Sequence, residues 1–121
     1  MRYLCLKYDA EGRLAAMSER ERRGYDEECR EYDDLLKRSR YYLGGEEFLA
    51  AEGSTTLRCD GDAIAVTAGP PTDAACRQLG RLFILEARDL NHVIQLTSNL
   101  PCMRLGGHLE IRPMHDLPRA G

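Results

Sequence analysis

Two segments of this 121-residue chain would be apolar on both faces if they formed β-strands, and this feature limits the possible folds most strongly. Lys7 is the only charged side chain within residues 3–8, and residues 81–87 contain the uninterrupted run Leu82-Phe83-Ile84-Leu85. Such strands are typical of central positions that are covered on both sides. Alternation in the first segment places Leu4, Leu6 and Tyr8 on one face, and Tyr3 and Cys5 on the other.

The periodicity predicts two helices that can cover these strands. The first is expected over about residues 18–41, where Ser18 and Glu21 form a capping box. Its charged positions are interpreted as a solvated face. Its apolar stripe consists of Tyr25, Cys29, Tyr32 and Leu36, with Leu35 beside it. The second helix is expected to begin after Asp89, its N-cap, and to end before Pro101.

The remaining elements complete an α+β order. Further strands are predicted at residues 46–50, 55–59, 63–67 and 108–114. The second and third of these form a hairpin around Asp60-Gly61, a dipeptide suited to a tight turn. The order strand, helix, strand, hairpin, strand, helix, strand predicts a ferredoxin-like split βαβ fold with an inserted β-hairpin.

The chain is expected to be one domain, residues 1–115, with a frayed tail at residues 116–121. Two helices can cover only one face of its sheet, so the other apolar face needs a different cover. A second copy of the chain is the simplest one. We therefore predict a homodimer whose sheets pack face to face, and a lone subunit with Tyr3 and Cys5 exposed would contradict that prediction.

Charge and cysteine content argue against several classes of function. Seventeen Lys and Arg against 20 Asp and Glu leave a net charge of −3, which disfavours direct nucleic-acid binding. The five cysteines have no C-x-x-C spacing and the three histidines are scattered, so no metal site is predicted. No phosphate-binding glycine loop points to a cofactor. No apolar stretch reaches membrane-spanning length and no signal peptide is evident, so a cytoplasmic protein is expected.

The best candidate site lies on the last strand, where His108, Glu110 and Arg112 alternate with Leu109 and Ile111. If the helices cover the face that carries Leu109 and Ile111, the three polar side chains face a cleft or the partner subunit. They then bind a ligand, form an ion pair that sets dimer register, or simply meet solvent. The full candidate ligand-binding set is Tyr8, Asp9, Asp73, His108, Glu110 and Arg112, with Asp9 or Glu110 as a possible base.

Each of the other candidates also has a plain structural interpretation. Asp9 is equally suited to cap the loop after the first strand, and Asp73 to a turn. Tyr8 is more typical of core than of cleft lining. His92, beside the apolar stripe of the second helix, is expected at the surface.

Several stretches resemble a known family. They are residues 2–9, 55–61, 66–70 and 79–90, followed by Pro101 and residues 109–113. Together they resemble the YCII-related family, in particular its DGPF subgroup, which implies a dimeric α/β barrel. The subgroup signature is altered, because Ala68 and Pro71 flank the retained Gly69-Pro70 and Asp73 is the candidate replacement for the signature's first glutamate.

A second departure concerns the catalytic histidine found in other branches of the family. The corresponding helix here offers Arg22, Arg23 and Tyr25 instead. The preferred hypothesis is therefore a domain that binds a small organic ligand or a protein partner in a cleft at the dimer interface. An enzyme that abstracts a proton from a small lactone or organic acid is the second hypothesis, with Arg112 holding the substrate. An accessory role in transcription through protein contacts is the third.

Overall fold

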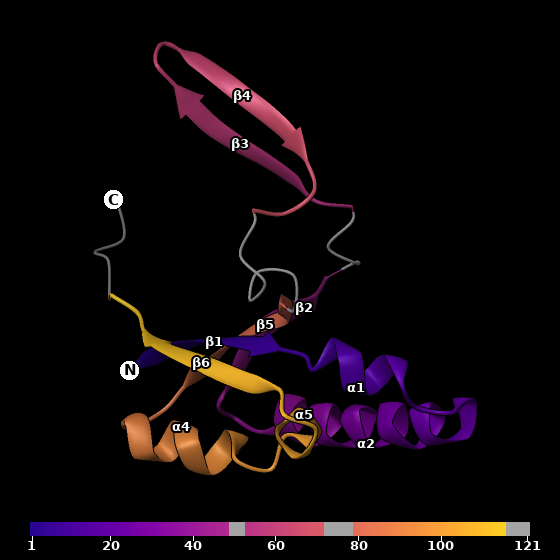
Figure 1. The fold of residues 1–121 in the computed structure, drawn as a ribbon. Coiled ribbons are helices and arrows are strands. Elements are labelled where there is room, and N and C mark those ends of the chain that lie inside the picture. Colours follow the sequence, from indigo (N-terminus) through magenta and orange to yellow (C-terminus); the bar gives the residue numbers. More distant parts are fainter. Residues whose placement is uncertain (49–52, 72–78, 116–121) are drawn as a thin grey trace.

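The computed structural model describes residues 1–48, 53–71 and 79–115 (Figure 1). The predicted tail, residues 116–121, lies outside this range. The helices are α1 (Glu11–Ala15), α2 (Glu19–Arg38), α4 (Leu90–Thr97) and α5 (Pro101–Arg104). The strands are β1 (Arg2–Tyr8), β2 (Tyr42–Glu47), β3 (Thr55–Asp60), β4 (Ala63–Ala68), β5 (Leu79–Glu86) and β6 (His108–Pro113).

The main sheet has four antiparallel strands in the order β2-β5-β1-β6. β1 and β5 are its two central strands, as their apolar faces predicted. This order confirms the ferredoxin-like split βαβ fold, and β3 and β4 form the predicted separate hairpin between the second and third sheet strands. No helix among the described residues is long and apolar enough to cross a membrane.

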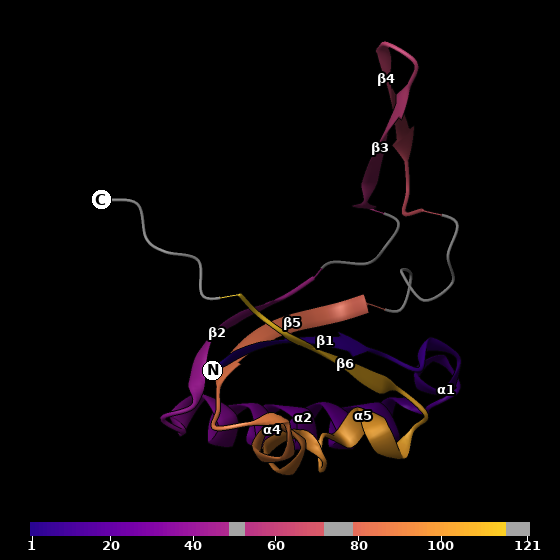
Figure 2. The ribbon, with the colours of Figure 1, turned by 90° about the vertical axis from the view of Figure 1, so that its left-hand side faces the viewer.

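α2, α4 and α5 all lie against one face of the sheet, and the hairpin rises on the opposite side (Figures 1 and 2). The covered face supplies Tyr3, Cys5, Phe83 and Leu85 to the core, which also contains Leu36, Val93 and Leu100 from the helical layer. Tyr3 and Cys5 are therefore buried by the chain's own helices. The face that needs a further cover is the other one.

The face that no described helix covers, called the open face from here on, carries half-buried aliphatic and aromatic side chains from the two central strands. They are Leu4, Leu6, Tyr8, Leu82 and Ile84. On β6, Leu109 and Ile111 pack against the core, so His108, Glu110 and Arg112 project on the open side. The predicted alternation along both strands is confirmed.

α2 has the predicted capping box between Ser18 and Glu21 and the predicted apolar stripe. It ends at Arg38, three residues earlier than expected, because Ser39 is extended and its hydroxyl donates to the Leu36 carbonyl. Leu35 is exposed and is not part of the core. The short helices α1 and α5 were not predicted, and Pro101 begins α5 rather than only ending the helix before it.

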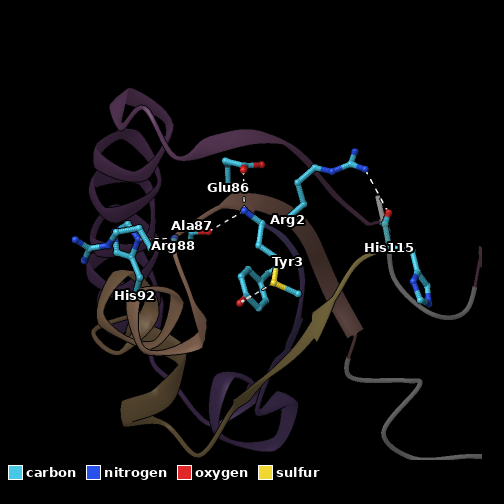
Figure 3. A network of polar contacts seen from close by, with 8 residues as sticks. Arg2, Tyr3, Glu86, Ala87, Arg88, His92 and His115 are labelled. Atoms are coloured by element: carbon cyan, nitrogen blue, oxygen red, sulfur yellow. Dashed lines mark hydrogen bonds and ion pairs between the residues drawn. The ribbon is translucent and has the colours of Figure 1, made fainter. Parts of the chain in front are cut away.

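His92 is buried, contrary to expectation. Its Nδ1 accepts a hydrogen bond from the Arg88 amide (3.2 Å) and its ring meets Tyr41 edge-on. Figure 3 shows Arg88 and His92 together with the start of β1, where the N-terminal ammonium donates to Glu86 Oε1 and to the Ala87 carbonyl. These bonds fasten the first strand to the end of β5.

Glycines at the turn and base of the hairpin have backbone angles that other residues rarely adopt. Gly61 in the turn has φ +64° and Gly69 at the base has φ +95°. The Gly69 amide donates to the Ser54 carbonyl (2.6 Å), and the Gly69 carbonyl accepts from the Thr56 hydroxyl (2.8 Å). The glycine retained from the altered signature thus closes the base of the hairpin.

Adjacent glycines of β2 should respond oppositely to a methyl group. A Cβ on Gly45 would lie 2.6 Å from the Leu82 carbonyl oxygen and 2.7 Å from Phe83 Cβ, whereas one on Gly44 meets nothing within 4 Å. Gly45→Ala is expected to lower the free energy of unfolding by about 1–3 kcal/mol through overpacking. Gly44→Ala, measured in the same urea titration, should leave it nearly unchanged. Equal effects would contradict the register of β2 on β5.

Candidate functional site

A cavity of about 540 Å³ lies on the helix side of the sheet, within the size range of small-molecule sites. Its floor is a cross-strand row in which Arg81 of β5 stands between Lys7 of β1 and Glu47 of β2. Its wall comes from α2, and Leu14 and Pro101 border it from α1 and α5. The cavity therefore sits where both central strands pass beneath the long helix.

Helical spacing explains why α2 supplies so many of the lining side chains. Tyr25, Cys29 and Asp33 recur at four-residue intervals and form one row. Arg22, Asp26 and Arg30 form the neighbouring row, in which Arg22 Nε donates to Asp26 (3.1 Å). One helix thus places an aromatic hydroxyl, a thiol and both signs of charge along the same cavity.

The deepest charged group in the site is Arg81. Its side chain is 8% exposed and forms an ion pair with Asp33, whose side chain is 14% exposed. Burial lowers the pKa of the Arg81 guanidinium below its usual value. Arg81 also lies over the Phe83 ring, 5.2 Å from its centroid, so the aromatic core fixes its position.

Two further groups on the cavity wall are held in their protonated forms. Burial raises the pKa of the Tyr25 hydroxyl and that of the Cys29 thiol. Both are therefore neutral at physiological pH and able to donate hydrogen bonds. The Asp9 carboxylate is 3.4 Å from Lys7 Nζ, and both side chains are largely buried.

Four of the predicted site residues meet on the open face instead. The Tyr8 ring stacks on His108, with centroids 4.6 Å apart, and the Tyr8 hydroxyl donates to Glu110 Oε1 (3.3 Å). Arg112 Nε donates to Glu110 Oε2, and this hydrogen bond holds the pKa of Glu110 below its usual value. The Glu–Arg pair considered from the sequence therefore forms within one chain.

The structure divides the predicted site between the two sides of the sheet. Asp9 lines the cavity, whereas Glu110 and Arg112 do not, so Asp9 is not brought together with Arg112. Tyr8 is half-buried on the open face and does not join the core. Asp73 lies outside the described residues.

Sequence reasoning missed the cavity because its most buried acid belongs to a helix face that was interpreted as solvated. Asp33 is one acidic residue among many on α2. The available signal was its position eight residues after Tyr25, in line with the apolar stripe. Arg81 also begins the most hydrophobic strand, where a charge needs a partner.

The side chains that line the cavity suit the binding of a polar molecule. Within the three described stretches, no group of three or more His, Cys, Asp or Glu side chains could hold a metal ion. Cationic groups, acidic groups and neutral donors all line one cavity, so it can match a small ligand that carries several oxygen atoms.

A model of the YCII-related domain matches residues 1–117 of the chain. Among solved structures, the chain is similar to 5-chloro-2-hydroxyhydroquinone dehydrochlorinase from Burkholderia phenoliruptrix AC1100, determined in complex with 2,5-dihydroxybenzoquinone. That similarity has a TM-score of 0.50 and 23% sequence identity, and it covers 95% of each chain. A comparison with curated proteins found no match.

Proposed function

The chain belongs to the YCII-related domain family, and from that premise we propose that it binds a small organic molecule in the cavity between α2 and the central strands. The observation that best supports this proposal is a cavity of about 540 Å³ that contains a buried, paired arginine together with Tyr25 and Cys29 as neutral donors. Burying Arg81 and Asp33 costs free energy of desolvation, and aliphatic residues at these positions would avoid that cost. A role in ligand recognition would explain why charged residues occur there.

A thermal-shift screen of small organic acids, phenols and lactones tests this proposal. A compound present at a hundredfold excess over its Kd should stabilise the folded chain by about 2.7 kcal/mol and raise its melting temperature. Cys29→Phe should abolish that rise because the larger ring projects into the cavity from its wall and displaces the ligand. Arg112→Ala, on the open face, should retain it.

Two results would count against the cavity as the binding site. One is a screen in which no compound raises the melting temperature of the unmodified chain. The other is a rise that survives Cys29→Phe and disappears in Arg112→Ala, which would place the ligand on the open face.

A second candidate function is elimination on a small ring compound, and the position of Asp9 on the cavity wall favours it. The Asp9 carboxylate would take a proton from a ring carbon, the freed electron pair would form a double bond, and a leaving group would depart with its bonding electrons. The dehydrochlorinase of similar fold supports this only as an analogy. With a small lactone that carries chloride on the saturated carbon next to the abstracted proton as the probe, Asp9→Asn should retain binding and lose chloride release. Unchanged release would remove Asp9 from the mechanism.

The open face supports the further proposal of a homodimer. The described helices all lie on the other side of the sheet, yet Leu4, Leu6, Leu82 and Ile84 line this one. Membership of the DGPF subgroup stays a prediction.

A further inference from the structure

The hairpin β3–β4, called the arm from here on, has one apolar face that no described residue covers. Leu57 pairs with Val66 and Cys59 pairs with Ile64, so these four side chains lie on the same face. Leu57, Ile64 and Val66 are 64%, 59% and 66% exposed. The opposite face carries Thr56, Arg58 and Thr67. This alternation is typical of a hairpin with one buried face, yet neither face is buried within the chain.

An isolated two-stranded hairpin is at best marginally stable in water. The arm has hydrogen bonds at its base, through Gly69, but its aliphatic residues do not belong to the core cluster of the chain. Its apolar face therefore indicates an external partner that stabilises it.

The direction of the arm identifies the partner. The arm rises on the side of the sheet opposite the helices, which is the side of the open face (Figure 2). A molecule bound to the open face would therefore lie alongside the arm. The open face and the apolar face of the arm are thus placed to contact the same partner.

The arm adds substantially to the apolar surface that the open face offers. Four strands spaced about 4.8 Å apart and about seven residues long give the open face a footprint of roughly 450 Å². The apolar face of the arm, two strands of about six residues, adds a footprint of roughly 200 Å². A partner that contacts both surfaces therefore covers a much larger apolar area than one that contacts the open face alone.

We propose that the arm packs its apolar face against a second copy of this chain, whose sheet covers the open face. The inference rests on the homodimer proposed above and adds a distinct contact to it. Two-fold symmetry makes the contact reciprocal, so each subunit is held by its partner's arm. Arg58, on the other face of the arm, remains in solvent.

Neighbouring positions of β4 provide matched variants, because Val66 and Ala65 are both exposed and lie on opposite faces of the arm. Sedimentation equilibrium should show the unmodified chain as a dimer. Val66→Asp should raise the dimer Kd by about a hundredfold, because a charge then meets the apolar contact. Ala65→Asp should leave the Kd unchanged. Far-ultraviolet circular dichroism of the helices verifies that each variant is folded.

The same experiment separates failure of the arm from failure of the dimer. Ile84→Asp should abolish association through the open face. If Ile84→Asp is monomeric while Val66→Asp dimerises like Ala65→Asp, the dimer stands and the arm contact is wrong. Equal weakening by Val66→Asp and Ala65→Asp would also overturn the arm contact. A monomeric unmodified chain would overturn both proposals.

Cys59 offers a direct readout without mutation. Its thiol is exposed in the single chain and lies on the apolar face of the arm. Maleimide labelling of Cys59, followed by peptide mass spectrometry, should be slow at concentrations where the chain is dimeric and should accelerate about tenfold or more on dilution below the Kd. A labelling rate independent of dilution across that range would contradict the proposal.

Discussion

Asp33→Ala is expected to lower the free energy of unfolding by about 3–5 kcal/mol, the usual cost of removing one partner from a buried ion pair. Asp33 is the only carboxylate that pairs with Arg81 among the described residues, and Arg81 Nε has no hydrogen-bond partner there. Arg81 also donates a long hydrogen bond to the Tyr42 hydroxyl (3.4 Å). Loss of the carboxylate therefore leaves a buried guanidinium without a charged partner among the described residues.

Urea denaturation measures this effect against two controls. Asp34→Ala, at the next and exposed position of α2, should cost less than about 0.5 kcal/mol. Replacing both partners by apolar residues, Asp33→Leu with Arg81→Met, should recover most of the stability because no charge is then left buried. If Asp33→Ala cost no more than Asp34→Ala, the ion pair would not be buried as described.

Phe83→Ala should also lower the free energy of unfolding by about 3–5 kcal/mol, because it leaves a cavity at the centre of the core. Phe83 is fully buried and its ring centroid lies 6.4 Å from that of Tyr42. The next residue, Ile84, projects to the open face and is half-buried. In denaturation of the monomeric chain, Ile84→Ala should therefore cost clearly less.

Self-association should respond in the opposite order to these two substitutions. Ile84→Ala removes a side chain from the open face and should raise the dimer Kd. Phe83→Ala, at a temperature where it remains folded, should leave that constant nearly unchanged. Equal costs of unfolding for the two variants would contradict the assignment of one covered and one open face.

Alternation along β1 and β5 made the fold predictable. Both strands carry apolar side chains on both faces, so each face of the sheet had to be covered by another part of the structure. The sequence-based dimer prediction placed Tyr3 and Cys5 under the partner subunit, and this was wrong because the chain's own helices bury them. Tyr3 and Leu4 are comparably apolar, so the pattern does not distinguish the two faces. α1 and α5 were missed because each is about one turn long and carries no periodic pattern.

The candidate site was less predictable than the fold, for a physical reason. Cavity residues are brought together by the crossing of α2 over the central strands, and no local pattern records that crossing. Asp9 was selected because it follows a strand, whereas Asp33 resembles its solvated neighbours in sequence. Glu110 and Arg112 were correctly assigned to one face, but that face is not the one with the cavity.

We propose that the two sides of this sheet serve different purposes, with a small molecule bound under α2 and a second subunit on the open face. Mapping the amide chemical-shift changes caused by a compound from the thermal-shift screen tests it most directly. We expect the largest changes at Lys7, Cys29 and Arg81, and their loss in Cys29→Phe. Chemical-shift changes centred on His108, Glu110 and Arg112, without changes at the cavity amides, would contradict binding in the cavity.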